Sequence, residues 1–230
     1  MKLAVMQPYF FPYIGYFQLV NAVDKFIFYD DVNYIKNGWI NRNRILINQA
    51  PSYLTLQLKG ASPFKHINEI EISNNAEKLK KTIFLAYKKA PFFDEVFPLI
   101  ETVLNVESNN LSDIAIQSIE SISRFLDIDR AFERSGSAYA ETLGLDREHR
   151  LYKLCKLNNA INYINPIGGA ELYTKKAFAD EGIDLSFLKS NPIQYKQFNH
   201  DFVPALSIID VLMFNSKEQI KIYLEEYQLV

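Results

Sequence analysis

The chain has 230 residues, a length close to the upper limit for one compact domain, which excludes a large multidomain protein. Hydrophobic residues make up 48% and charged residues 23%, so the chain can bury an ordinary core and is not compositionally disordered. The 25 basic residues are balanced by 27 acidic ones, which excludes a global cationic field that would recruit nucleic acid or an anionic membrane.

The first thirty or so residues predict a strand, a helix and a second strand. Residues 3–6 form a short apolar run that ends at Gln7 and Pro8, and apolar residues between 14 and 23 recur near helical spacing. Residues 26–29 form another short apolar run that stops at two aspartates. Because these three segments have together the length of a βαβ unit, we expect the first two strands to be parallel.

A change of pattern follows the second strand. Residues 33–44 form a polar and aromatic loop, after which 45–47 and 53–58 predict short strands. Residues 76–126 then carry three apolar faces at helical spacing, with no flexible linker, low-complexity tract or repeat. We therefore interpret residues 76–126 as a helical insert within a single domain that spans residues 1–230.

After residue 130 strands and helices alternate again. The expected elements are strands at 131–133 and 161–164 and helices at 143–157, 170–178, 202–214 and 218–227. This alternation is typical of a parallel sheet covered by helices. The predicted fold class is therefore α/β, with a Rossmann-like, mainly parallel sheet and a helical insert.

The cysteine count and the apolar runs of the sequence indicate the cellular compartment. The single cysteine, Cys155, can form neither an internal disulfide nor a thiolate-rich zinc site, and the three scattered histidines add no metal-binding signature. Gln7 and Pro8 interrupt the apolar start, so it does not read as a cleaved signal peptide. No stretch approaches the roughly 18 apolar residues that a membrane helix needs. We expect a cytoplasmic protein that does not span a membrane.

Three loops follow expected strands, where ligands of open α/β sheets bind. They comprise residues 7–12, 30–44 and 165–170. Their polar and aromatic residues and glycine backbone would line a shared cleft: Gln7, Tyr9, Asp30, Asp31, Lys36, Arg42, Arg44, Gly168 and Gly169. Arginine binds phosphate oxygens, carboxylates and amides bind hydroxyls, and glycine permits close backbone approach, so this set suits a phosphorylated, hydroxyl-rich ligand.

Each group has a structural alternative. Asp30 and Asp31 are equally typical of a turn after a strand, and Arg42 and Arg44 alternate as the charged edge of a strand does. The two glycines at 168–169 match neither a P-loop nor a dinucleotide-binding pattern, so a tight turn explains them as well.

Two residues near the C-terminus are candidates for proton transfer. His200 lies in a polar segment that lacks helical periodicity, which is also typical of a surface loop. Asp210 follows Ser207 by three residues inside an apolar run, and a buried aspartate requires hydrogen-bond partners. Structural bonding and an active-site role both remain open for Asp210. Cys155 fits an apolar helix face and is not a candidate nucleophile.

Several segments in order along the chain resemble the WbqC-like protein family. They are Met6–Pro12, Tyr29–Val32, Trp39–Arg44, Tyr163–Tyr173 and Leu206–Asp210, which together span nearly the whole chain. That family is associated with gene sets for bacterial surface polysaccharide and O-antigen, and transfer of a glycyl or other aminoacyl group to an amino sugar has been suggested for it. The start of the chain also loosely resembles nucleotidylyltransferases, although Tyr16 follows Gly15 where their signature has histidine.

The resemblance implies a transferase that acts on a nucleotide-activated amino sugar, with a sugar nucleotide and an acyl donor as small-molecule partners. The positions that match the family motifs are Gln7, Pro8, Pro12, Asp30, Asp31, Trp39, Asn41, Arg42, Arg44, Gly168, Gly169, Tyr173, Tyr195, Gln197, Ser207 and Asp210, and Lys36 joins this expected site from the loop after the second strand. The alternative is a noncatalytic protein of the same pathway that binds a sugar nucleotide or a partner. The oligomeric state and the identity of the sugar and donor stay open.

The transferase hypothesis gives these residues separate roles. Arg42, Arg44 and Lys36 would hold the diphosphate, whereas Asp30 and Asp31 would bind hydroxyls or a divalent metal ion; no other cofactor is implied. An attacking amine must lose a proton, so Asp210 or His200 would act as the base, and the amides at 168–169 would stabilise an oxyanion.

Overall fold

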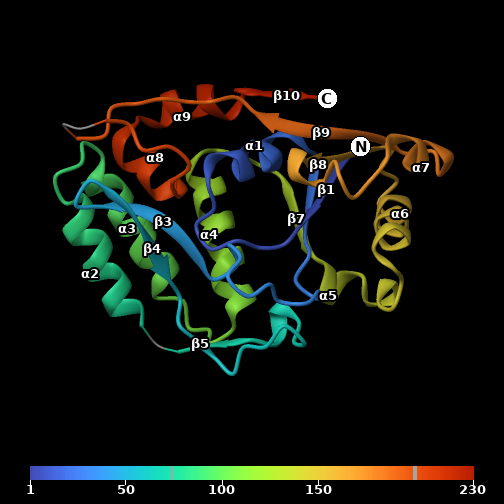
Figure 1. Ribbon diagram of the computed structural model, residues 1–230, viewed down its shortest axis with the longest axis horizontal. Coiled ribbons are helices and arrows are strands. Elements are labelled where there is room, and N and C mark those ends of the chain that lie inside the picture. Colours follow the sequence, from blue (N-terminus) through green and yellow to red (C-terminus); the bar gives the residue numbers. More distant parts are fainter. Residues whose placement is uncertain (74, 199–200) are drawn as a thin grey trace.

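A six-stranded sheet lies at the centre of the protein, for which a computed structural model describes residues 1–73, 75–198 and 201–230 (Figure 1). Its strands, in spatial order, are β10 (Tyr227–Leu229), β9 (Asp184–Ser190), β8 (Asn162–Pro166), β1 (Lys2–Met6), β2 (Lys25–Phe28) and β7 (Ala131–Arg134). All neighbours pair in parallel except β10, which is antiparallel to β9. The prediction of a mixed α/β fold with a mainly parallel sheet is confirmed.

The expected βαβ unit is present at the start of the chain. Helix α1 (Ile14–Ala22) connects β1 to β2, and Val5 is the pairing partner of Ile27 in the parallel register. The next strands, β2 and β7, extend the sheet away from β1 on one side, whereas β8 and β9 extend it on the other side. The strand order therefore reverses between β1 and β8.

Helices cover both faces of the sheet. Because successive strand residues point to opposite faces, Leu3 and Ala4 belong to two different apolar clusters. Leu3 packs with residues of α6 (Arg147–Leu157) and α7 (Lys175–Asp180). Ala4 belongs to the larger cluster, to which α1, α4 (Leu111–Phe125), α8 (Ile208–Phe214) and α9 (Lys217–Leu224) contribute. This burial on both faces explains the continuous apolar runs of β1 and β2.

The segment between β2 and β7 occupies much of the left and lower part of the molecule in Figure 1, with α8 and α9 above it. It contains a hairpin, a second small sheet and three helices: β3 (Arg42–Ile47), β4 (Ala50–Thr55), β5 (Leu58–Lys59), β6 (Glu71–Ile72), α2 (Ala76–Tyr87), α3 (Phe93–Leu104) and α4. Helices fill the region where the periodicity of residues 76–126 predicts them. On α2 the buried residues Leu79, Ile83 and Tyr87 recur every fourth position and place one face against the shared core.

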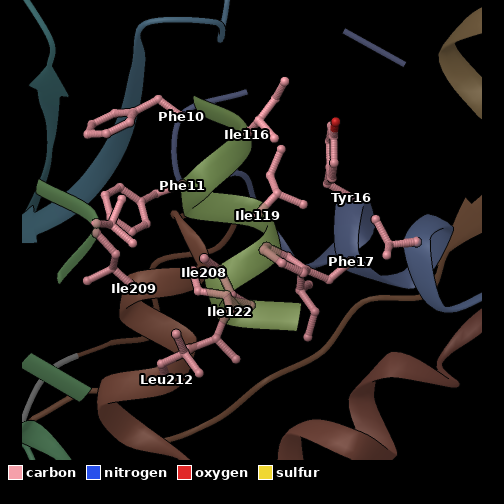
Figure 2. Packing of buried hydrophobic residues seen from close by; sticks show 14 of the residues in the cluster. Phe10, Phe11, Tyr16, Phe17, Ile116, Ile119, Ile122, Ile208, Ile209 and Leu212 are labelled. Atoms are coloured by element: carbon pink, nitrogen blue, oxygen red, sulfur yellow. The ribbon is translucent and has the colours of Figure 1, made fainter. Parts of the chain in front are cut away.

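Two adjacent aromatic residues anchor the loop that follows β1. Phe10 and Phe11 are fully buried, and Figure 2 shows them on one side of α4, whereas Ile116 and Ile119 project from its other side. Phe11 has φ 42°, a left-handed backbone that a bulky residue adopts only when its surroundings impose it. Its backbone N–H donates to Ser118 Oγ at 3.0 Å, and its carbonyl accepts from Ser207 Oγ at 2.7 Å.

Helix starts differ from the sequence expectations because side-chain caps decide them. The helix expected at 143–157 begins only at Arg147, where the Asp146 carboxylate accepts from two backbone amides. Thr174 and Ser207 similarly cap α7 and α8, which begin later than the expected 170 and 202. The strand expected at 53–58 lies at Ala50–Thr55, and β9 and β10 were not expected.

The remaining short elements are α5 (Ser135–Ala138) and 3₁₀ turns at Ile67–Glu69, Ala140–Thr142 and Ile167–Gly169. Within the ranges that the structure describes, no helix has both the length and the apolar character needed to cross a membrane.

Candidate functional site

The carboxyl ends of β1, β2, β8 and β9 meet at one edge of the sheet, because these strands run parallel. Ligands of open α/β sheets bind at this edge, next to the point where the strand order reverses. Here the reversal lies between β1 and β8. Helix α1 begins after the Gln7–Pro12 loop, which follows β1.

A cavity of about 550 Å³ lies at this edge, between the start of α1 and the segment after β9. Its walls are mainly aromatic and aliphatic, with a few polar side chains: Tyr13, Ile14, Gly15, Ser190, Asn191, Pro192, Ile193, Gln194, Tyr195, Phe202, Pro204, Ala205, Leu206 and Val211. A second cavity of about 540 Å³, next to Glu120 and Arg130, lies at the amino end of β7 and thus at the opposite edge. We therefore place the candidate site in the first cavity.

Three residues at the start of α1, Tyr13, Ile14 and Gly15, line this cavity. Tyr13 is the N-cap residue but makes no side-chain capping bond, and the first turn contains no acidic residue. A Cβ atom at Gly15 would lie 2.5 Å from Ser190 Oγ and 2.4 Å from the Tyr13 ring, so only glycine lets α1 approach β9 this closely. The uncapped amides and the helix dipole favour a negatively charged group at this position.

Asp210 lies on α8 behind the wall of the cavity and is fully buried. Its Oδ1 accepts hydrogen bonds from the Tyr195 hydroxyl at 2.7 Å and from Gln197 Nε2 at 2.6 Å. Its Oδ2 accepts from the Tyr87 hydroxyl at 2.8 Å. Gln197 also exchanges hydrogen bonds with the backbone of Val203, which fixes the orientation of its amide. The expectation that a buried Asp210 requires partners is thereby confirmed.

The two tyrosines of this network are held as neutral donors. Burial, followed by the charge of Asp210, raises the pKa of Tyr87 and of Tyr195 well above the usual range. Both hydroxyls therefore stay protonated and donate hydrogen bonds to the carboxylate. Of these residues Tyr195 also lines the cavity, so it links the cavity to Asp210.

Asp30 and Asp31 belong to a second buried network, just beyond the end of β2. Asp31 forms an ion pair of 2.5 Å with Arg150 of α6 and accepts from the Ser135 hydroxyl. Asp30 accepts from Ser112 Oγ at 3.2 Å and from the Gly136 amide at 3.0 Å. These contacts connect β2, α4, α5 and α6.

Arg150 shields this network from solvent. Its guanidinium lies 4.7 Å above the ring of Tyr29, and its Nε donates to Thr142 Oγ1 at 3.0 Å. Burial raises the pKa of Tyr29, although the neighbouring charges of Arg150 and Arg147 act in the opposite direction. The structure thus gives Asp30 and Asp31 internal partners that sequence reasoning did not identify.

The two arginines of β3 lie on the outward face of the hairpin. Arg42 donates to the backbone carbonyls of Asn37 and Gly38, and its guanidinium lies 4.4 Å from the centre of the Tyr53 ring. Arg44 donates to the carbonyl of Ala205 at 3.0 Å and lies 5.8 Å from the Trp39 ring. The expected alternation of Arg42 and Arg44 along a strand is therefore present. Ala205 lines the cavity, so Arg44 reaches its rim.

The asparagines next to these arginines have structural partners. Asn41 is buried, accepts from the Tyr34 hydroxyl at 2.9 Å and donates to the carbonyl of Leu56. Asn43, which the sequence hypothesis did not include, donates to the carbonyl of Phe11 at 2.9 Å. Both side chains therefore fix the hairpin and the loop after β1.

Other expected site residues are spread along the same sheet edge. Gln7 follows β1, and its carbonyl accepts from the Tyr16 hydroxyl. The two glycines at 168–169 follow β8 in a 3₁₀ turn, and the Tyr173 ring packs edge-on against Phe178. Neither these residues nor Arg42 and Lys36 line the 550 Å³ cavity.

The positions nearest the cavity among the expected set are Pro12, Arg44, Tyr195, Gln197, Ser207 and Asp210. Ser207 caps α8 and fastens the loop after β1, and the carbonyl of Pro12 accepts from the amide of Ile208 at 2.8 Å. His200, the other candidate base, lies outside the described residues. Elsewhere, the described ranges contain no cluster of three or more histidine, cysteine or acidic side chains that could hold a metal ion.

The matches to known proteins cover nearly the whole length of the chain. The model of the WbqC-like protein family matches residues 7–222. An uncharacterized protein of Mycobacterium tuberculosis is 30% identical over 220 residues, which cover 93% of each of the two chains. No solved structure matches significantly.

Proposed function

The chain belongs to the WbqC-like protein family, and from this membership and the geometry of the cavity we propose that it is a cytoplasmic transferase of bacterial surface-polysaccharide biosynthesis. The proposed reaction transfers an aminoacyl group, such as glycyl, to the amine of a nucleotide-activated amino sugar in O-antigen synthesis. The partners are thus a sugar nucleotide and an acyl donor. Asp30 and Asp31 are not proposed as metal ligands, because their buried carboxylates bind Arg150 and the hydroxyls of Ser112 and Ser135.

One observation carries the proposal: a cavity large enough for a small ligand opens at the carboxyl edge of the parallel sheet, between the uncapped start of α1 and the end of β9. Open α/β sheets bind their ligands at this edge, so we propose that this sheet does the same. The mainly apolar walls offer few groups that bind water, which favours acyl transfer to an amine over hydrolysis.

Tyr195 and Asp210 supply a path for the proton that the amine must lose. In this step the amine nitrogen forms a bond to the acyl carbon, and the bond from that carbon to its leaving group breaks. The amine proton passes to Tyr195 Oη while the Tyr195 proton passes to Asp210 Oδ1, which lies 2.7 Å away. Tyr195 is the residue that faces the cavity, and Asp210 acts through it.

The test is incubation of the purified protein with amino-sugar nucleotides and aminoacyl donors, followed by measurement of the mass of intact products. We expect one product heavier than the sugar nucleotide by the acyl group. Tyr195→Phe keeps the ring but removes the hydroxyl, so kcat should fall about 100-fold. Tyr223→Phe is the matched control, because the bond that the Tyr223 hydroxyl donates to a backbone carbonyl is exposed and 3.4 Å long. Absence of product with every donor and acceptor pair would refute the transferase.

A second function is favoured by the chemistry of Asp210 itself. Asp210 accepts hydrogen bonds from Tyr87, Tyr195 and Gln197, and these bonds hold the cavity-lining Tyr195 in one position. That property suits a noncatalytic protein that binds a sugar nucleotide. Binding to the parent protein without turnover, unchanged in the Asp210→Asn variant, supports this function. Turnover in the parent that Asp210→Asn abolishes while ligand binding persists supports the transferase.

We also propose that the chain forms one α/β domain. Its larger apolar cluster contains Phe28 of the central sheet, Ile83 of α2 and Ile116 of α4, so the helices between β2 and β7 share a core with the sheet.

A further inference from the structure

The outward face of the β3–β4 hairpin carries two aromatic rings and two guanidinium groups. In the antiparallel register Arg44 lies directly opposite Tyr53, and Arg42 lies two residues along the same face of β3. Trp39 completes the group, with its ring centre 6.3 Å from that of Tyr53. Trp39 is 39% exposed and Tyr53 is 53% exposed, so both rings are available to a ligand. We call Trp39, Arg42, Arg44 and Tyr53 the hairpin platform.

The two guanidinium groups are oriented by neutral partners and keep unused donors. Arg42 uses its Nε and one terminal nitrogen to bind backbone carbonyls, and Arg44 uses one terminal nitrogen to bind Ala205. Among the residues that the structure describes, neither guanidinium lies within ion-pair distance of a carboxylate. The remaining positive charge on this face is complementary to an anion, and an arginine fork binds phosphate oxygens at two points.

The hairpin platform adjoins the cavity. Arg44 binds Ala205, which belongs to the cavity wall, and the carbonyl of Arg44 accepts from the amide of Ser207 at 2.8 Å. A ligand that fills the cavity can therefore extend over the edge formed by residues 204–206 onto the face of the hairpin.

We propose that the hairpin platform binds the nucleoside diphosphate part of a sugar nucleotide whose sugar lies in the cavity. The arginines bind the diphosphate, and the base stacks on the exposed rings of Trp39 and Tyr53, because an aromatic ring beside a cationic group is a typical stacking surface for nucleobases. This assignment rests on the proposed function for the identity of the ligand, but it concerns binding and does not require turnover.

The chain contains a single tryptophan, so its intrinsic fluorescence reports on the hairpin platform directly. The experiment titrates the full-length protein with the diphosphates of uridine, thymidine, guanosine, cytidine and adenosine, with N-acetylglucosamine, and with UDP-N-acetylglucosamine. Free tryptophan amide corrects for light absorbed by the bases. We expect saturable quenching by at least one nucleoside diphosphate and by a sugar nucleotide with the same base, and none by the free sugar.

Variants separate specific binding from nonspecific quenching. Arg42→Ala and Arg44→Ala should each weaken the apparent affinity about tenfold, which is the effect of losing one charge-assisted contact. Arg124→Ala is the matched control, because Arg124 lines the cavity at the opposite edge of the sheet, and it should leave the affinity unchanged. Phe64→Ala removes another exposed aromatic ring, 90% accessible, and should also have no effect.

The outcomes distinguish this inference from the proposed reaction. Saturable quenching that depends on Arg42 and Arg44, in a protein that forms no transfer product, supports nucleotide binding at the hairpin platform and refutes the transferase function. If Arg42→Ala and Arg44→Ala leave the KM for the sugar nucleotide unchanged, nucleotide binding at the hairpin platform is refuted, whereas the transferase function is retained. Absence of quenching by every nucleotide, or equal quenching by the free sugar, overturns the inference.

Discussion

The hydroxyl of Tyr87 donates to Oδ2 of Asp210 at 2.8 Å, although 123 residues separate the two in the chain. The same hydroxyl accepts a hydrogen bond from the backbone amide of Leu46 at 2.9 Å. One buried oxygen thus joins α2, β3 and α8, and it holds the hairpin and the residues behind the cavity in one arrangement.

Replacement of Tyr87 by phenylalanine should therefore destabilise the protein. Tyr87→Phe keeps the ring in the core but leaves the Leu46 amide and one Asp210 oxygen without this partner, which costs about 1–3 kcal/mol. Unfolding in urea measures the loss. The control, Tyr223→Phe, should change the free energy of unfolding by less than about 0.5 kcal/mol, because its hydroxyl bond is long and exposed. Equal losses in the two variants would contradict the structure.

Loss of the buried ion pair between Asp31 and Arg150 should destabilise the protein more than loss of the Tyr87 hydroxyl does. Arg150→Met leaves the Asp31 carboxylate buried without its cation, so the free energy of unfolding should fall by about 3–5 kcal/mol. Addition of Asp31→Asn should recover part of that loss. Lys156→Met breaks the more exposed pair with Glu181 and should have a much smaller effect, because solvent screens that pair. A small effect of Arg150→Met would show that the pair is not buried.

Two adjacent glycines after β8 should respond differently to alanine. A Cβ atom at Gly169 would lie 1.8 Å from Nδ2 of the buried Asn165, whereas a Cβ atom at Gly168 meets nothing within 4 Å. Gly169→Ala should lower the free energy of unfolding by about 1–3 kcal/mol, because Asn165 must move. Gly168→Ala should be neutral within about 0.5 kcal/mol. Thermal unfolding of both variants provides the comparison. A larger loss of stability in Gly168→Ala than in Gly169→Ala would contradict the close approach of Gly169 to Asn165.

The thiol of Cys155 should make stability depend on pH in the alkaline range. Burial raises its pKa to about 12, whereas a thiol in the unfolded chain ionises near about 8.5. The folded state thus favours the protonated thiol, so its contribution is complete below about pH 8.5 and declines as the pH rises toward 12.

At about pH 10 this contribution should be about 2 kcal/mol smaller than at neutral pH. Urea unfolding at both pH values measures the change in the parent and in Cys155→Ala. The alanine variant is less stable throughout but lacks this part of the pH dependence. Identical pH dependence in parent and variant would mean that the thiol is not buried.

Local patterns in the sequence predicted the elements that are apolar throughout or along one face. The apolar runs at 3–6 and 26–29, with the helical spacing between them, correctly predicted the parallel βαβ unit. Helix starts were less accurate, because a cap such as Ser207 acts through one side-chain hydrogen bond that periodicity does not contain. β9 was missed, since its seven residues mix buried and exposed positions without strict alternation.

The candidate site was predicted in part. Sequence motifs drew attention to Asp31 and Asp210 but not to their partners Arg150 and Tyr87, which are 119 and 123 residues away in the chain. A lone arginine on α6 or a tyrosine at the end of α2 has no local signal of such a contact. The sequence likewise grouped Arg42 with the two glycines at 168–169, whereas the structure places Arg42 on the hairpin and the glycines after β8.

The sequence by itself determined the mixed α/β class, the parallel start of the sheet and the helices between residues 76 and 126. Only the tertiary structure decided that Asp210 is enclosed behind the cavity wall while Arg42 and Arg44 remain at the surface. The physical reason is that periodicity reports which face of an element is apolar. Burial and hydrogen-bond partners of a charged side chain depend instead on elements that the rest of the chain brings against it.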